Sequence, residues 1–220
     1  MLDNNGNKDN TEERRIIHLK MTLLSDTIFG NGMSLPGDGD ILVLTDAKGF
    51  PYYKGSTFKG VLREEMTRIY EWEKAEDEKQ GDDSDCKEDN DIIAMFGEGN
   101  SGTANADTNG RSLVFSDFTL SAKVKEEILG ELGDDRTAIL DCLTNMRAFT
   151  RISEEGTADV GSLRYARCVN KGLIFYGTIT CSSLDEASIK NAVHFVKCIG
   201  TMRNRGFGNV RIEEETEKSA

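Results

Sequence analysis

Alternation of apolar and polar residues near the start of the chain predicts a strand, and the next apolar pattern predicts a helix. Residues 16–24 alternate as expected for a strand with one buried face. Apolar residues then recur at helical spacing from Phe58 to Trp72. Ser56 or Thr57 stands at the start of this run, where a hydroxyl can cap the first turn. A glycine- and aspartate-rich loop, a short extended run and a turn connect the two elements, at residues 25–39, 40–45 and 47–55.

The second half of the chain has the same mixture of strands and helices. A helix over residues 185–199 can be capped by Ser183 or Asp185. Residues 137–146 fit either a helix or a strand. The other predicted elements are a helix over residues 121–132 and strands over residues 111–118, 162–169, 173–181 and 209–212.

This order of elements predicts the fold class. Without its long loops the chain runs strand, helix, strands, helix, strand, which fits an α+β, ferredoxin-like (RRM-like) antiparallel sheet with helices on one face. We expect a single domain over residues 1–220. The polar segment 149–161 contains two glycines and is predicted to project as a loop or hairpin. Three charged segments lack apolar periodicity and are predicted to be flexible: 1–13, 73–91 and 213–220.

The charge distribution is compatible with a nucleic-acid partner, although the net charge is −12. The segment from Glu71 to Asp91 holds eleven acidic residues and three lysines, so the rest of the chain carries only −4. Basic residues instead gather in three places, at Lys54 to Arg63, at Arg147 to Arg167 and at Arg203 to Arg211. Local cationic clusters of this kind can line a groove for a polyanion.

Cysteine usage and hydropathy limit the class of protein. The five cysteines are odd in number, widely spaced and without a CxxC pair, which favours reduced thiols over a zinc site or a disulfide framework. No apolar stretch reaches the length of a transmembrane helix, and the N-terminus has no apolar signal-peptide core. We therefore expect a cytoplasmic protein with no membrane partner.

A glycine- and arginine-rich loop over residues 200–210 is the first candidate binding element. Three glycines and two arginines fall within nine residues, between a predicted helix and a predicted strand. Glycine permits positive φ and close backbone approach, and successive free amides with arginine side chains can bind phosphate. An ordinary glycine-rich turn is the alternative interpretation.

The second candidate is the segment from Pro36 to Arg63. A helix that begins with hydroxyls and Lys59 is a natural phosphate site, and a nearby aspartate can bind a divalent cation or accept a proton. A capped helix after an aspartate-containing turn is the plainer interpretation. The two histidines, His18 and His194, would support acid–base catalysis only if the fold brought them together.

Together these stretches resemble the RAMP superfamily, and specifically the backbone subunit of type III CRISPR effector complexes. The resemblance spans nearly the whole chain. Four segments match family motifs in order: Asp40–Asp46; Gly49–Tyr52 with Lys54–Gly60; Met95–Gly97 with Ser112–Asp117; and Gly200–Val210. Thr27–Gly30 stands where the family usually has His-x-Gly. Residues 147–167 lack the sequence motif that is commonest in the family's thumb.

The resemblance implies a crRNA-binding subunit of a complex that cleaves complementary single-stranded target RNA. It implies that Asp40 is the catalytic residue and binds Mg²⁺ or Mn²⁺, with Asp38 as the main rival and Asp26 as a weaker one. It implies a thumb near residues 149–161, and other effector subunits and further RAMP copies as partners. The expected RNA-binding residues are Lys54, Ser56, Thr57, Lys59, Arg63, Arg151, Arg164, Arg203, Arg205, Gly206 and Gly208. The alternatives are a non-catalytic RAMP subunit that caps or positions the crRNA, and a crRNA-processing endoribonuclease.

Overall fold

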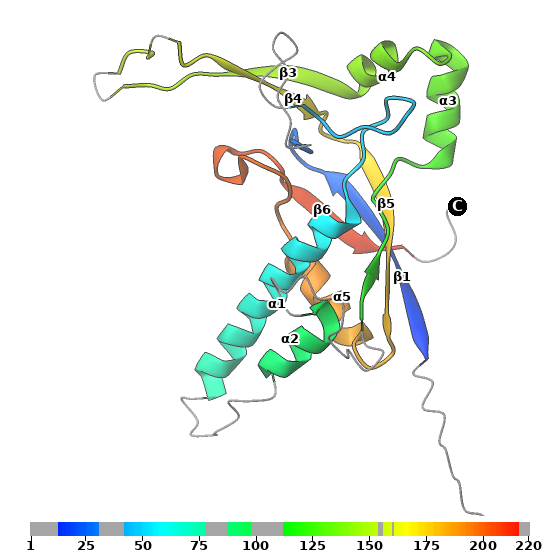
Figure 1. The fold of residues 1–220 in the computed structure, drawn as a ribbon, viewed down its shortest axis with the longest axis vertical. Helices are drawn as coiled ribbons and strands as arrows, with labels where there is room; N and C mark the ends of the chain where they lie inside the picture. The colour runs from blue at the N-terminus through cyan, green and yellow to red at the C-terminus, as the bar shows by residue number, and fades with distance from the viewer. Residues whose placement is uncertain are drawn as a thin grey trace, which may run out of the picture.

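The structure, a computed structural model, describes residues 13–30, 42–77, 88–97, 112–153, 156–159 and 161–215. Helices and strands alternate along the chain, as Figure 1 shows. In order they are β1 (Arg14–Leu23), α1 (Gly55–Asp77), α2 (Glu88–Phe96), β2 (Val114–Phe115), α3 (Ala122–Leu132), α4 (Arg136–Leu143), β3 (Thr144–Phe149), β4 (Arg164–Val169), β5 (Ile174–Ser182), α5 (Glu186–Phe195), the 3-10 helix η1 (Arg203–Arg205) and β6 (Val210–Glu214).

The predicted α+β class and antiparallel sheet are confirmed. Four strands form one sheet in the order β2-β5-β1-β6, and all of its pairs are antiparallel. In β1, Ile17, Leu19, Met21 and Leu23 are buried, while the residues between them are exposed or half-buried. This period of two gives the sheet one face for the core and one face without a helical cover.

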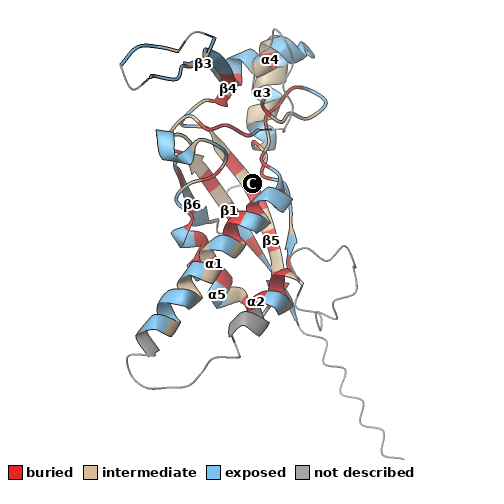
Figure 2. Ribbon diagram, turned by 60° about the vertical axis from the view of Figure 1, so that its left-hand side comes forward, coloured by how far each residue is buried: buried red, intermediate tan, exposed pale blue. Residues whose placement is uncertain are grey.

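Helices α1 and α5 cover the buried face of the sheet. Figure 2 shows buried positions concentrated where these helices face the strands. Aromatic rings fill the space between the layers, and the Phe58 and Phe118 rings lie 4.8 Å apart with edge-to-face geometry. Gly177 of β5 leaves room for this contact, because a Cβ atom there would lie 2.9 Å from the Phe118 ring.

The starts and ends of both long helices differ from the prediction. Helix α1 begins at Gly55, so Ser56 and Thr57 lie inside its first turn, and the predicted hydroxyl cap is wrong. The carboxylate of Asp117 instead accepts a hydrogen bond from the Gly55 amide at 2.8 Å. Helix α5 ends at Phe195 rather than residue 199, because the Ile199 amide donates to the Gly208 carbonyl at 2.9 Å.

The segment 137–146, whose sequence fitted either a helix or a strand, contains part of each. Helix α4 begins after Asp135, whose side chain accepts hydrogen bonds from two amides of the first turn, and it ends at Leu143. Strand β3 follows directly and pairs with β4 in a separate two-stranded sheet. In the described residues 112–118 of the next predicted strand, only Val114 and Phe115 form strand β2. Phe118 forms a bridge with Tyr53, and Thr119 then bridges to Tyr176 of β5.

Strands β3 and β4 form a hairpin that projects from the main sheet, at the top left of Figure 1. Its base is held by a small apolar cluster in which the Phe149 and Phe207 rings lie 5.5 Å apart. Beyond Phe149 the described residues pair through a bridge between Ile152 and Ala158 and a hydrogen bond from the Asp159 amide to the Arg151 carbonyl at 2.9 Å. The predicted projection is therefore a hairpin that begins at β3, earlier than residue 149.

Parts of the three segments predicted to be flexible belong to helices and strands. Helix α1 continues to Asp77, α2 begins at Glu88, and β6 extends through Glu214. Glu214 is ordered by pairing with β1 and by a salt bridge to Lys190 at 2.8 Å. Residues 1–12, 78–87 and 216–220 lie outside the described residues. Within the part of the chain that is described, no helix has the length and apolarity needed to span a membrane.

Candidate nucleic-acid interface

A groove lies between the start of α1 and the glycine-rich loop, and we call it the main groove. Its volume is about 510 Å³. The polar and basic side chains or backbone groups that line it come from Tyr53, Lys54, Thr57, Glu64, Thr201 and Arg203. Two segments more than 130 residues apart in sequence therefore meet at one surface.

The glycine-rich loop is fixed in place by the segment that follows β1. The Thr201 amide donates to the Ile28 carbonyl at 3.3 Å, and the Gly208 amide donates to the Asp26 carbonyl at 3.0 Å. Gly200 has a φ of 74°, and a Cβ atom there would lie 2.5 Å from the Ile28 carbonyl oxygen. Close backbone approach therefore requires glycine at this position. Because the Gly208 amide is already bonded, that residue holds the loop in place rather than offering a free donor.

Arg203 and Arg205 belong to one short 3-10 helix but line different surfaces. Arg203 lines the main groove, where its guanidinium lies 3.8 Å from the Glu64 carboxylate. Both side chains of this pair are largely exposed, so the contact contributes little to stability. Arg205 and the exposed Gly206 line a second groove on the other side of the loop.

The predicted basic residues of α1 are only partly brought together. Lys54 and Thr57 line the main groove and are exposed. Ser56 is exposed, while Lys59 and Arg63 are half-buried, and none of these three lines the groove. Of the predicted RNA-binding residues in this region, the groove therefore contains only Lys54 and Thr57.

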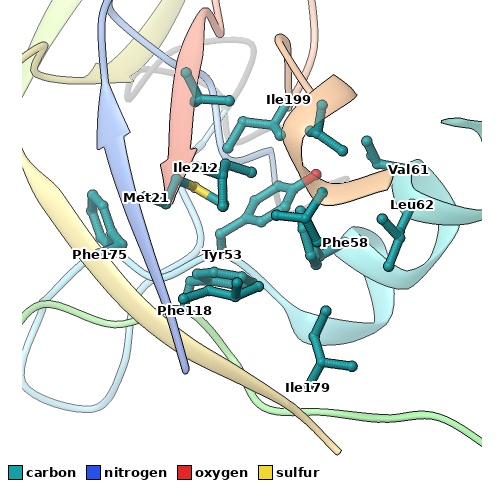
Figure 3. Packing of buried hydrophobic residues seen from close by; sticks show 14 of the residues in the cluster. Met21, Tyr53, Phe58, Val61, Leu62, Phe118, Phe175, Ile179, Ile199 and Ile212 are labelled. Atoms are coloured by element: carbon teal, nitrogen blue, oxygen red, sulfur yellow. The ribbon is translucent and has the colours of Figure 1, made fainter. Parts of the chain in front are cut away.

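Tyr53 contributes a buried hydroxyl to the main groove. Its side chain packs among core residues, with the hydroxyl oxygen directed toward the chain near Ile199, as Figure 3 shows. Tyr53 is only 3% exposed, and the hydroxyl forms no hydrogen bond of good geometry. Burial raises the pKa of Tyr53 to about 12, although the nearby Gly200 amide and the Arg203 charge act in the opposite direction. A buried hydroxyl without a well-formed hydrogen bond lowers stability, so Tyr53 is held here by the packing of its ring.

The second groove surrounds Asp26 and has a volume of about 370 Å³. The Asp26 carboxylate accepts hydrogen bonds from the Arg147 guanidinium at 2.5 and 3.1 Å, from the Asn145 side chain at 3.3 Å and from the Lys171 amide at 3.1 Å. Burial raises the pKa of Asp26, but these hydrogen bonds and the Arg147 charge outweigh it and hold that pKa below its usual value. Asp26 thus joins β1, β3 and the β4–β5 turn.

Two of the predicted RNA-binding arginines lie on the hairpin. Arg151 lies beyond the end of β3, is largely exposed and has its guanidinium 3.5 Å from the Asp159 carboxylate. Arg164 is the first residue of β4 and is exposed. Neither lines the main groove, so the fold separates them from Lys54 and Arg203.

The candidate catalytic residues Asp38 and Asp40 lie outside the described residues. The chain on either side of them is described: Gly30 and Val43 form a bridge, and the Leu44 amide donates to the Phe29 carbonyl at 2.8 Å. Gly30 and Leu44 both line the main groove.

The described residues do not by themselves form a metal site. No group of three or more His, Cys, Asp or Glu side chains that could hold a metal occurs among them. Glu64 is the carboxylate that the described part of the chain contributes to the main groove, and it lies beside Arg203. Mg²⁺ and Mn²⁺ are bound by several oxygen ligands, so the described residues alone do not match such an ion.

The two histidines are not brought together. His18 is exposed on β1, on the face of the sheet that has no helical cover. His194 is exposed on α5, which packs against the other face. This arrangement gives no support to a two-histidine acid–base pair.

Several residues of these grooves were not identified from the sequence. Tyr53, Arg147 and Lys171 line the grooves, and the sequence analysis named none of them as a binding residue. Arg147 belonged to a predicted basic cluster, and Tyr53 lies between two of the matched motif segments.

Comparisons with known proteins agree with this fold. A family model of the RAMP superfamily matches residues 20–211. A chain of the type III-B Cmr-beta structure bound to cognate target RNA superposes with a TM-score of 0.62 at 13% sequence identity, covering 91% of this chain and 97% of that one. A chain of the apo-state Cmr-beta structure gives 0.60 at 13% identity, covering 92% and 98%. A comparison with curated proteins gives no match.

Proposed function

The chain belongs to the RAMP superfamily, and we propose from this membership that it is a crRNA-binding backbone subunit of a type III CRISPR effector complex. The observation that carries the proposal is the main groove, which Lys54 and Arg203 line together although they are far apart in the sequence. Structural similarity to chains of Cmr-beta, one of them bound to target RNA, supports the type of complex. Other effector subunits and further RAMP copies are its proposed partners.

The groove suits an RNA backbone better than a base-specific contact. Cations and hydroxyls bind phosphate and ribose oxygens irrespective of sequence. A phosphate can replace the exposed Glu64 carboxylate beside Arg203, because that pair is long and weakly stabilising. Sequence selection would then come from pairing between the guide and its target, with the protein holding the guide by shape and charge.

RNA binding is tested with the double variant Lys54→Ala/Arg203→Ala. The expected result is weaker binding of every single-stranded RNA and a salt slope lower by roughly 0.7 for each lost phosphate contact. Filter-binding titrations at several salt concentrations measure both quantities. Lys48→Ala/Lys123→Ala is the matched control, because it removes two exposed lysines that do not line either groove. An affinity and a slope equal to those of the control would contradict the proposal.

Target-RNA cleavage through Asp40 is the catalytic part of the proposal. Asp40 is proposed because it opens the Asp40–Asp46 segment that resembles a family motif. A carboxylate beside bound RNA can stabilise charge that develops at the scissile phosphate, with Mg²⁺ or Mn²⁺ supplied in solution. Asp38 remains the rival. Asp26 is disfavoured, because four hydrogen bonds already occupy its carboxylate.

Asp40→Ala is expected to abolish cleavage by the assembled complex and to leave crRNA and target binding intact, since an interaction made in the transition state affects rate rather than affinity. Single-turnover cleavage of a labelled complementary RNA, with Asp38→Ala as the matched control, measures this. Full activity of the Asp40 variant would exclude that residue. Absence of cleavage by the wild-type complex would favour the non-catalytic RAMP subunit that caps or positions the crRNA.

The projecting hairpin is the proposed thumb. Its outer part is exposed, with Ile152 66% and Leu163 56% accessible, and it lies away from the helical core. Apolar side chains held in solvent on a projecting element can contact stacked bases or a neighbouring subunit. A crRNA-processing endoribonuclease is the least supported alternative, because His18 and His194 lie on opposite sides of the sheet.

A further inference from the structure

The second groove concentrates positive charge in an otherwise acidic protein. Arg147 of β3, Lys171 of the β4–β5 turn and Arg205 of η1 line it together with Asp26. The Lys171 and Arg205 side chains are exposed, and Arg147 is about half exposed. Three cations around one carboxylate leave a net charge of about +2 at this surface.

Asp26 orients Arg147 without consuming all of its donors. The Nε and Nη2 atoms of Arg147 both donate to one carboxylate oxygen of Asp26. A guanidinium has five N–H donors, so its Nη1 end is left for a second acceptor. A fixed guanidinium loses less conformational entropy on binding an anion than a free one does.

The glycine-rich loop makes the two grooves neighbours. Arg203 lines the main groove and Arg205 lines the second one, and both belong to the same three-residue helix. The loop is attached to residues 25–28 on the side of the protein core, through the Asn209, Gly208 and Thr201 amides. A single strand of RNA that leaves the main groove can therefore pass over η1 and enter the second groove.

We propose that the second groove binds phosphates of the same single-stranded RNA that occupies the main groove, one step further along the strand. This inference rests on the RNA-binding function proposed above. Phe207 favours RNA over an acidic protein segment as the occupant, because its half-buried ring lines the groove beside Arg205 and can stack with a base. The residues assigned to the site are Arg147, Lys171, Arg205 and Phe207, with Asp26 positioning Arg147.

The test compares two labelled oligouridines, a trinucleotide that can fill one groove and a dodecanucleotide that can cross both. Lys171→Ala/Arg205→Ala is expected to weaken the long RNA about tenfold and to lower its salt slope by roughly 1.4, because two phosphate contacts are lost. Binding of the short RNA is expected to be unchanged. Lys54→Ala/Arg203→Ala should weaken both RNAs, and Lys48→Ala/Lys123→Ala should weaken neither. Thermal unfolding checks that each variant is folded.

The outcomes separate the two proposals. If the wild type binds the long RNA and Lys171→Ala/Arg205→Ala binds it equally well, the second site is overturned. The proposal for the main groove is then unaffected. Equal loss for the short and the long RNA overturns the consecutive arrangement. Binding of oligoglutamate that depends on Lys171 and Arg205, with no such dependence for RNA, would assign the groove to an acidic protein partner instead. If the wild type binds neither RNA, both proposals fail.

Discussion

Asp26 is the residue whose charge does most to connect separate elements. Its carboxylate has 11% of its side-chain surface exposed and joins the end of β1 to β3 and to the β4–β5 turn. Hydrogen bonds to a charged acceptor contribute about 1.5–3 kcal/mol each when the acceptor is partly buried. The pKa of Asp26 lies below its usual value, so its contribution to folding depends on pH.

Asp26→Asn is expected to lower the free energy of unfolding by about 2 kcal/mol at pH 7. Because the folded-state pKa is depressed, the stabilisation is fully present above the unfolded pKa of about 3.9 and is lost as the pH falls through the folded pKa. Urea unfolding at pH 7 and near pH 2.5 should therefore show a difference from wild type that narrows in acid. Asp134→Asn, at an 89% exposed carboxylate, is the control. A pH-independent difference would refute the electrostatic role.

At the scale of elements, the glycine-rich loop is shaped more by its own backbone than by its basic side chains. Gly206 and Gly208 have φ values of 85° and 76°, in the region that favours glycine. Their surroundings differ, since a Cβ atom at Gly206 meets nothing within 4 Å, whereas one at Gly208 would overlap the Ile199 carbonyl oxygen. Substitutions at Gly206 and Gly208 therefore distinguish the cost of a strained φ angle from the cost of a clash with nearby backbone.

Gly208→Ala is expected to destabilise the protein by at least about 3 kcal/mol, because strain and a backbone clash add together. Gly206→Ala is the matched control and should cost only about 1–2 kcal/mol, from strain alone. Thermal or urea unfolding of both variants measures the difference. Equal losses would show that the loop relaxes away from Ile199 and that its anchoring to the core is weaker than the structure indicates.

At the scale of the whole molecule, the acidic segment 78–87 separates two helices that pack on one core. Helix α1 ends just before this segment and α2 begins just after it. Ile92 and Met95 of α2 are buried. The sequence 78–87 holds four acidic residues, two lysines and no large apolar residue. Because this composition offers little apolar area to bury, the sequence predicts that the segment contributes little to stability.

Replacing residues 78–87 with a short Gly-Ser linker is therefore expected to leave the melting temperature within about 2 °C of wild type. Removing residues 73–91, the whole tract predicted to be flexible, should lower it further, because the end of α1 and the start of α2 are lost with it. Thermal unfolding of the two deletions side by side tests this. A large loss from the shorter deletion would assign the tract a structural role.

Most elements could be predicted because their signals are local. The alternation in β1 and the helical spacing from Phe58 to Met66 were correctly interpreted, since each reports one buried face. The helix boundaries were less accurate, because the Gly55 amide is capped by Asp117, 62 residues away, and α5 ends where Ile199 pairs with Gly208. Such partners are set by topology and leave no mark near the boundary.

For the candidate site, too, some features could be predicted from the sequence and others required the tertiary structure. The sequence determined the family, through motifs in a fixed order, and it identified the two segments that form the main groove. Only the tertiary structure decided that Lys54 and Arg203 line one groove, that Arg205 belongs to a second groove with Arg147 and Lys171, and that the Tyr53 hydroxyl is buried without a partner. The physical reason is that periodicity records which face of an element is buried, whereas a binding site depends on which distant backbones approach closely.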